Sequence, residues 1–187
     1  MNSLEIKKLE RFTIDDQKLL GRFGYSSAYK YKVTRDLSDQ KTIISIELVR
    51  LETEYVKVYP EEMDDFERYK KLISHDLSLG IFRNRELIGV AICEPYYWNK
   101  TLFIWNFHVS ERYQRCGVGV SLMQGLEELA RLKGFRAVGL ETQNTNVPAV
   151  NFYKKCGFEI EGIDLSYYTN DDVEDGEVAF FMRKKII

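Results

Sequence analysis

The first part of the chain alternates between polar stretches and short hydrophobic runs. Residues 42–51 are rich in branched side chains and partly alternate with polar ones, which predicts a strand, and residues 55–59 predict a second short strand that pairs with it. Residues 61–75 predict a helix, because carboxylates crowd its first turn and apolar residues recur at helical spacing. The first forty residues show no pattern that assigns them.

The middle of the chain is dominated by strand patterns. Residues 77–82 and 87–94 are hydrophobic runs on either side of Arg83-Asn84-Arg85-Glu86, which is typical of a hairpin turn. A further turn at Asn99-Lys100 precedes the hydrophobic run 101–109. This part therefore predicts three consecutive strands.

The last part changes between helical and strand periodicity. Apolar residues at spacings of three and four predict a helix after residue 117, and Gly134 ends it. Residues 137–140 predict a strand, and residues 158–168 and 177–183 predict a final antiparallel pair after another short helix. The order strand, helix, strand, helix, strand, strand predicts an α/β (α+β) protein with a mixed sheet flanked by helices.

That short helix has recognisable ends. Asn146 is suited to be its N-cap, Pro148 is tolerated in the first turn, and Gly157 is suited to end it. Asn146, Ala149 and Tyr153 fall at positions i, i+3 and i+7, so an amide, a small residue and a phenol share one face. The same pattern also fits a capped packing helix with a core tyrosine.

The loop before the longer helix has the features of an anion site. It contains Gln114-Arg115-Cys116-Gly117-Val118-Gly119, in which two glycines lack the Cβ that would keep a phosphate away from the backbone. The N–H groups of this loop and of the first helical turn can converge on an anion such as a pyrophosphate. An ordinary tight turn between a strand and a helix is the alternative. The side chain of Arg112 or Arg115 could add positive charge.

These two segments together resemble a known family. The pattern Gln-x-x-Gly-x-Gly at 114–119, followed by Asn-x-x-Ala-x-x-Phe-Tyr-x-Lys-x-Gly-Phe at 146–158, is similar to the paired acetyl-CoA motifs of the GNAT superfamily of N-acetyltransferases. The resemblance covers about the last two thirds of the chain. Residues 141–146 and 156–160 are also similar to streptothricin acetyltransferases.

The resemblance implies a fold and an acyl donor. It implies one acetyltransferase domain over residues 1–187, with a variable substrate-side part at 1–60 and an acetyl-CoA-binding core at 77–187. The sheet would be mostly antiparallel, with a splayed parallel pair of strands at the acetyl-CoA site. The cofactor-binding residues that it implies are Phe107, His108 and Val109 through their backbone, Gln114, Arg115, Cys116, Gly117, Val118 and Gly119 at the pyrophosphate, and Asn146, Ala149 and Tyr153 on the short helix.

Acetyl transfer to an amine needs a base, an oxyanion donor and an acid for the departing thiolate. The resemblance places a backbone N–H near residues 107–109 at the thioester oxygen. Tyr153 matches the family tyrosine, and a phenol with a pKa near 10 stays protonated at neutral pH and can donate a proton. A tyrosine that only packs against acetyl-CoA is the alternative.

The base is less clearly indicated. Many members of the superfamily have a carboxylate on the strand before the glycine loop, where this chain has Asn106, which cannot act as a base. Glu141, at the end of the next predicted strand, is the leading replacement, with Glu94 and His108 behind it. A water chain, direct binding of the neutral amine, and a purely structural role for Glu141 remain alternatives.

Composition narrows the class further. The chain has 187 residues, 44% of them hydrophobic and 30% charged, which suits one soluble domain. The sequence shows no membrane-length apolar run and no signal peptide, so we expect a cytoplasmic protein that does not bind membranes. Three cysteines without CxxC spacing and two histidines argue against a metal site, and no cysteine has a neighbouring histidine that would favour an acyl-enzyme.

The net charge of the chain bears on which substrates and macromolecules it can bind. A net charge of −2 gives no drive toward nucleic acid and mildly favours a cationic substrate. Residues 1–60, 96–98 and 164–168 are the least family-like and are expected to recognise the substrate. The acidic run 170–177 could add negative charge there, although such runs are more often solvated loops.

The sequence therefore predicts an acetyl-CoA-dependent N-acetyltransferase. The acceptor would be a primary amine of a small cationic molecule that attacks directly, with a streptothricin-type antibiotic, and hence antibiotic resistance, as the leading named possibility. A protein or peptide N-acetyltransferase and a non-catalytic acyl-CoA-binding module are the alternatives. A homodimer is suggested by family analogy alone.

Overall fold

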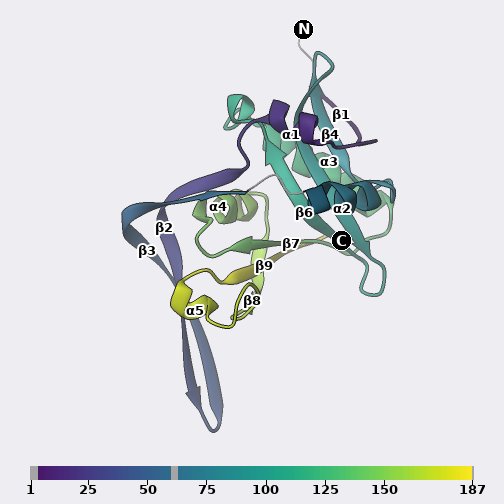
Figure 1. Ribbon diagram of the computed structural model, residues 1–187. Coiled ribbons are helices and arrows are strands. Elements are labelled where there is room, and N and C mark those ends of the chain that lie inside the picture. Colours follow the sequence, from purple (N-terminus) through teal and green to yellow (C-terminus); the bar gives the residue numbers. More distant parts are fainter. Residues whose placement is uncertain (1–3, 60–62, 187) are drawn as a thin grey trace. The chain divides into compact units, whose positions relative to one another are not determined.

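The computed structural model describes residues 4–59 and 63–186 (Figure 1). These residues form two compact units. The first unit contains residues up to Phe23, residues 58–140 and the C-terminal residues from Lys184. The second contains residues 24–57 and 141–183. The prediction of one acetyltransferase domain stays a prediction. Two carboxylates of the helix predicted over residues 61–75, Glu61 and Glu62, lie outside the described residues.

The elements of the described chain are mostly strands. The strands are β1 (Leu4–Lys8), β2 (Gly24–Ser38), β3 (Lys41–Val58), β4 (Leu79–Arg83), β5 (Glu86–Tyr96), β6 (Thr101–Val109), β7 (Ala137–Gln143), β8 (Glu159–Asp164) and β9 (Ala179–Lys185). The helices are α1 (Ile14–Leu20), α2 (Met63–Ile73), α3 (Val118–Leu132), α4 (Val147–Lys155) and α5 (Asp172–Asp175), with a 3-10 turn at Glu111–Tyr113.

The sheet is mixed, as the sequence predicted. Its strands follow the order β1-β4-β5-β6-β7-β9-β8, while β2 and β3 form a separate two-stranded ribbon. The pairs β1–β4, β4–β5, β5–β6 and β8–β9 are antiparallel, and β6 and β7 are parallel. The parallel register runs from Thr101 beside Ala137 to Ile104 beside Leu140, and β6 continues to Val109 paired with β5. The predicted α/β class with a mostly antiparallel sheet is therefore confirmed.

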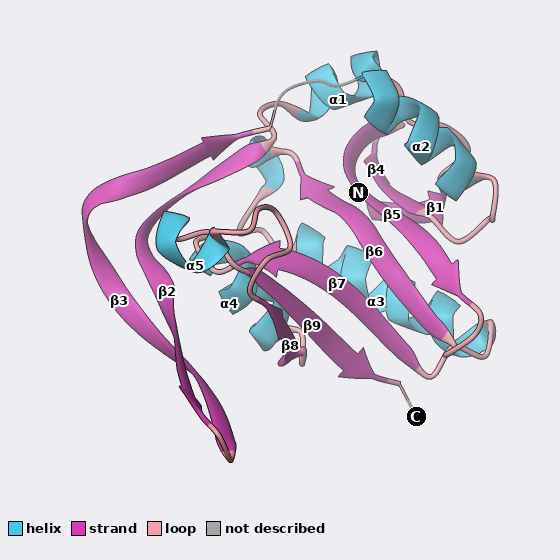
Figure 2. Ribbon diagram, turned by 60° about the horizontal axis from the view of Figure 1, so that its bottom comes forward, coloured by secondary structure: helices cyan, strands magenta, loops and turns pink. Residues whose placement is uncertain are grey.

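Helices cover both faces of the sheet in the first unit (Figure 2). Leu20 of α1 and Leu72 of α2 belong to one buried cluster with Val90 and Ile92 of β5. Gly125 of α3 lies against Ile6 and Leu79, in strands β1 and β4. Leu79 pairs with Ala91, whose side chain points away from those of its neighbours 90 and 92 because strand residues alternate between faces. Helix α3 is therefore on the face opposite to α1 and α2.

The tight turn between β4 and β5 follows from its residues. Asn84 has φ of 51° and Arg85 has φ of 71°, so both central residues are in the left-handed region. Two such residues form a type I′ turn, whose twist matches the twist of the two strands that it connects. Asparagine is one of the residues that tolerates a positive φ. The predicted hairpin is confirmed.

The ribbon of β2 and β3 in the second unit corrects one prediction. Residues 55–59 were expected to form a separate strand against residues 42–51, but residues 41–58 are one continuous strand that pairs with β2. Most residues of β3 are exposed, and the polar residues 52–54 between the two predicted strands gave no sign that the strand continues through them. Strand β2, which lies within the first forty residues, was not predicted.

Candidate functional site

The predicted anion loop has the geometry of a helix start with unpaired amides. Gly117 is the N-cap of α3 with φ of 84°, and the amide of Ser121 donates to its carbonyl oxygen at 3.0 Å. The amides of Val118 and Gly119 lie in the first turn, where the helix itself supplies no acceptor. Nothing lies within 4 Å of the position that a Cβ of Gly117 would occupy. A phosphate can therefore approach the N-terminus of α3 closely.

The residues before Gly117 shape this loop. Arg115 has φ of 58°, which is uncommon for a residue with a side chain, and Cys116 is exposed. The side-chain amide of Gln114 donates to the carbonyl oxygen of Val109 at 3.0 Å. Gln114 thus fastens the loop to the end of β6, a role that its sequence motif did not reveal.

His108 lies at the same strand end and is neutral at physiological pH. Its ring stacks on that of Phe23 with 3.7 Å between centroids, and Nε2 is buried without a hydrogen-bond partner among the described residues. Burial lowers the pKa of His108 from 6.5 to about 4, against a smaller opposite effect of the Leu20 backbone. Because His108 is a weak base, Glu141 is the better candidate for the proton acceptor.

We expect the depressed pKa of His108 to appear in the acid stability of the protein. A lowered folded-state pKa adds stability above pH 6.5, and this contribution is lost as the pH falls toward about 4. His108→Phe, which keeps a ring beside Phe23, removes the effect. Between pH 7 and pH 4.5 the wild type should lose up to about 2–3 kcal/mol more unfolding free energy than His108→Phe, measured by urea denaturation.

The exposed His75 gives the matched control for this experiment. His75→Phe should lose stability on acidification to the same extent as the wild type. Equal losses in the wild type and in His108→Phe would contradict a neutral, buried His108.

Glu94, the other alternative to Glu141 in the first unit, is already engaged, and so is Asn106 at the position where many family members have a carboxylate. The indole N–H of Trp105 donates to the carboxylate of Glu94, and the side-chain amide of Asn106 donates to the hydroxyl of Tyr69 at 3.0 Å. The guanidinium of Arg68 lies over the Trp105 ring at 3.5 Å from its centroid. Glu94 therefore has a structural role in holding an aromatic side chain.

Cys93 is buried, and burial raises the pKa of its thiol, which disfavours the thiolate that a nucleophile needs. This observation weighs against a covalent route through Cys93 and favours direct attack by the amine.

In the second unit, α4 has the predicted ends. The side chain of Asn146 accepts a hydrogen bond from the amide of Ala149 at 3.2 Å, and Gly157 has φ of 88° just after the helix. Tyr153 is only 8% exposed, and its ring packs on Phe158 with 5.7 Å between centroids. Asn146 is thus a cap, and Tyr153 is part of the core of this unit as well as a candidate acid.

Glu141 lies in β7, two residues before its last residue, and its carboxyl has an altered pKa. It is partly buried and accepts a hydrogen bond from the hydroxyl of Tyr168. Burial raises its pKa, and this outweighs the lowering by the Tyr168 hydrogen bond and by the charge of Lys57. A carboxylate whose pKa is raised toward neutrality is a better proton acceptor than an ordinary one.

Sequence reasoning did not find a second carboxylate beside this position. Glu177 lies at the end of the acidic run that was read mainly as a solvated loop, yet its side chain is 22% exposed and forms an ion pair with Lys57. The hydroxyls of Tyr25 and Tyr55 lie 3.3 and 3.0 Å from one of its oxygens. In the sequence Glu177 stood out only by its negative charge, because Tyr25, Tyr55 and Lys57 are more than 100 residues away from it along the chain.

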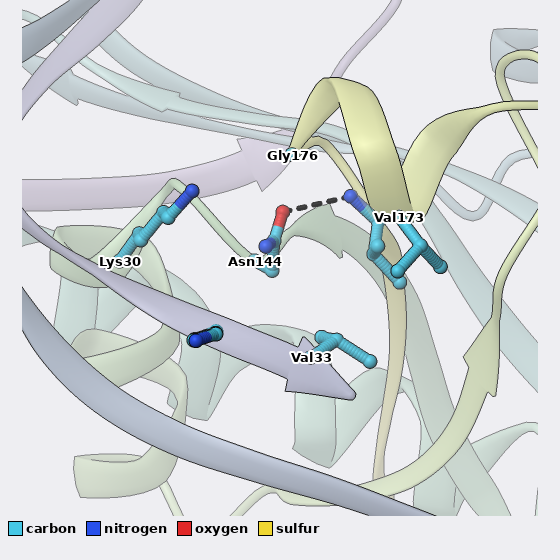
Figure 3. Close-up of a pocket in the computed structure, with 7 residues that line it drawn as sticks. Lys30, Val33, Asn144, Val173 and Gly176 are labelled. Carbon is cyan, nitrogen blue, oxygen red and sulfur yellow. Dashed lines mark hydrogen bonds between the residues drawn. The ribbon is translucent and has the colours of Figure 1, made fainter. Parts of the chain in front are cut away.

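A cavity of about 290 Å³ also lies in the second unit (Figure 3). Asn144 lies in its wall, where its side chain accepts from the Val178 amide at 2.7 Å and donates to the Tyr31 carbonyl at 2.8 Å. The residues lining it are Lys30, Lys32, Val33, Asn144, Val173, Gly176 and Val178. The two lysines make it basic, so it does not suit an amine substrate.

The predicted residues thus fall in both units. Residues 107–109 and 114–119 are in the first, and Glu141, Asn146, Ala149 and Tyr153 are in the second. Among the described helices, none is long and apolar enough to cross a membrane.

Comparison with known proteins settles the family. The family described as Acetyltransferase (GNAT) matches residues 45–158, which is more than half of the chain. The chain belongs to the GNAT family of acetyltransferases. This confirms the resemblance carried by the loop and by α4.

Streptothricin acetyltransferases are among the relatives of this GNAT protein. One from Escherichia coli is 35% identical over 102 residues, covering 54% of this chain and 58% of that protein. One from Streptomyces lavendulae is 32% identical over 97 residues, covering 52% and 51%. The chain therefore spans only about half the length of the curated relatives that it matches.

A solved structure extends the likeness to the whole fold. A Bacillus anthracis protein in complex with acetyl coenzyme A superposes with a TM-score of 0.72 at 24% identity. The superposition covers 98% of this chain and 99% of that one. This likeness shows that the two proteins share the GNAT fold.

Proposed function

We propose that this protein transfers the acetyl group of acetyl-CoA to a primary amine of a small cationic molecule, with a streptothricin-type antibiotic as the leading acceptor. The observation that carries the proposal is the Glu141 carboxylate, whose pKa burial raises. It supplies the base that Asn106, in the usual position of the acidic residue, does not. The names of the relatives support the choice of acceptor.

The chain offers groups for each part of acetyl-CoA. The amides at the start of α3, with Gly117 as N-cap, suit the pyrophosphate, and Arg115 can add charge. The backbone of residues 107–109 suits the pantetheine arm and the thioester oxygen, and Asn146 and Ala149 suit the same arm from α4. Acetyl-CoA supplies the activated acetyl group as a thioester.

The reaction then needs two proton transfers. The amine nitrogen forms a bond to the thioester carbonyl carbon while Glu141 accepts a proton from the amine. The carbon–sulfur bond breaks, and the CoA thiolate takes a proton from the hydroxyl of Tyr153. Tyr168, which donates to Glu141, keeps that carboxylate oriented.

The proposal is tested by following free CoA thiol with purified protein, acetyl-CoA and a panel of amines headed by streptothricin. Release with streptothricin supports the full proposal. Release only with other amines keeps the acetyltransferase and discards the antibiotic. Release only with peptides favours the protein or peptide alternative, and binding of acetyl-CoA with no release favours the non-catalytic module.

We expect Gly117→Ala to weaken acetyl-CoA binding at least about tenfold, because a Cβ in the left-handed region costs about 1–2 kcal/mol and displaces the amides at the start of α3. Isothermal titration calorimetry measures the Kd. Gly134→Ala is the matched control, because Gly134 has φ of 75°, equally open surroundings, and follows the other end of α3. Equal losses of affinity in both variants would contradict pyrophosphate binding at this loop.

A further inference from the structure

The ion pair of Glu177 with Lys57 has the composition of an ammonium-binding site. The Lys57 Nζ lies 2.7 and 2.6 Å from the two carboxylate oxygens of Glu177. Their side chains are 25% and 22% exposed. The ammonium also lies 5.8 Å from the centre of the Tyr168 ring. A carboxylate and an aromatic face are the groups that recognise a primary ammonium.

Hydroxyl groups complete the surroundings of the carboxylate. The Tyr55 hydroxyl donates to Oε1 of Glu177 at 3.0 Å, and the Tyr25 hydroxyl lies 3.3 Å from the same atom. Thr145 lies 2.7 Å from the Tyr25 hydroxyl. These groups are far apart in the sequence of the second unit and hold Glu177 in place. The Lys57 ammonium that Glu177 binds is, in contrast, at the end of a flexible four-carbon side chain.

The candidate base shares this environment. The charges of Lys57 and Glu177 both act on the carboxyl of Glu141, and Tyr168 donates to Glu141 while its ring faces Lys57. A substrate whose reacting amine lies at Glu141 would therefore need only a short carbon chain to bring a second amine to Glu177. Glu177 has no assigned part in the transfer itself.

We propose that Glu177, with Tyr25 and Tyr55, binds a second, non-reacting ammonium group of the acceptor, and that Lys57 is the internal occupant that this group displaces. The acceptors are then diamines or polyamines rather than monoamines. Displacement is feasible because the incoming ammonium keeps the charge of Glu177 paired, while the Lys57 ammonium, at the end of a flexible side chain that is 25% exposed, moves into water. This inference rests on the proposed function for its link to acetyl transfer, although the site can be tested separately.

Binding to the site is tested without turnover in Lys57→Met, which keeps the apolar stem and removes the ammonium. Propylammonium chloride should raise the Tm of this variant in a saturable way, compared with sodium chloride at the same ionic strength. In the wild type the rise should need a higher concentration, because Lys57 must first be displaced, and the double variant Lys57→Met/Glu177→Gln should show no such rise. Equal shifts in all three proteins would overturn the inference.

Displacement is tested in the wild type, which avoids any folding defect of the variant. Acetic anhydride labels accessible amines, and mass spectrometry gives the fraction of Lys57 that is labelled. Spermidine should increase labelling of Lys57 several-fold relative to the exposed Lys7 and Lys8. Unchanged labelling of Lys57 at saturating spermidine would overturn the inference.

Steady-state kinetics test whether the Glu177 site binds the acceptor during acetyl transfer. With acetyl-CoA, Glu177→Gln should raise KM for 1,5-diaminopentane about tenfold or more and leave KM for 1-aminopentane within about twofold. Equal effects on the two amines would overturn the role of Glu177 in substrate binding. If no amine is acetylated but propylammonium still stabilises Lys57→Met through Glu177, the proposed function fails and the ammonium site stands.

Discussion

Replacing Glu141 with glutamine is expected to lower kcat about 100-fold or more. General-base catalysis contributes about 10²–10⁴-fold in enzymes, and the amide of glutamine keeps the size of the side chain but cannot accept the amine proton. Tyr168 can still donate a hydrogen bond to the amide oxygen, so the local structure is preserved. Initial rates of CoA release at saturating acetyl-CoA measure the effect.

The pH dependence of kcat/KM tests the role of Glu141 in a second way. A base must be deprotonated, so kcat/KM should fall as the pH falls through the raised pKa of Glu141, which lies above the usual 4.5. Tyr168→Phe removes a hydrogen bond that lowers this pKa and should move the acid limb to higher pH. An acid limb that persists in Glu141→Gln would assign the base to another group.

Glu94→Gln is the matched control for the base. Glu94 is also a carboxylate on a strand, but it accepts from the Trp105 indole and has no place in the proposed proton transfer. We expect its kcat to stay within a few-fold of the wild type. A loss in Glu94→Gln as large as that in Glu141→Gln would contradict the assignment of the base.

Replacing Tyr153 with phenylalanine is expected to lower kcat about 100-fold while the protein remains folded. The phenylalanine keeps the ring that packs on Phe158, and only the proton donor for the departing thiolate is lost. The Kd for acetyl-CoA should change little, because the phenol acts on the leaving group. Single-turnover rates together with the Kd separate these effects.

Tyr31→Phe is the control for the loss of a hydroxyl from a buried ring. Tyr31 is 8% exposed like Tyr153, and its hydroxyl accepts from the Lys154 ammonium at 3.0 Å. We expect kcat to be nearly unchanged in this variant. A Tyr153→Phe variant with full activity would leave Tyr153 with a packing role alone, which is the alternative that the sequence left open.

Local chemistry explains which elements could be predicted from the sequence. The ends of α4 follow from Asn146 and Gly157, and the start of α3 follows from Gly117, because each signal lies within a few residues of its effect. The turn at Asn84 depends on a residue that tolerates positive φ. The single-residue roles of Glu141 and Tyr153 in the transfer stay predictions.

Elements that depend on distant partners were not predictable in this way. Strand β1 pairs with β4 across some seventy residues, from Leu4 beside Arg83 to Lys8 beside Leu79, and its five residues are all exposed. The ribbon of β2 and β3 is likewise exposed over most of its length, and neither β2 nor the continuity of β3 from residue 41 to residue 58 was predicted. Such strands form because a partner supplies their hydrogen bonds, and the partner is not visible in the local sequence.

The sequence by itself determined the family, the glycine loop at residues 114–119 that is proposed to bind an anion, and the helix that follows it, because glycines, caps and apolar spacing act over a few residues. Only the tertiary structure decided the surroundings of the two carboxylates. Glu141 acquires its raised pKa from burial, and Glu177 acquires an ammonium partner 120 residues away along the chain. Desolvation and ion pairing depend on what the fold packs around a group, so the order of residues cannot reveal them.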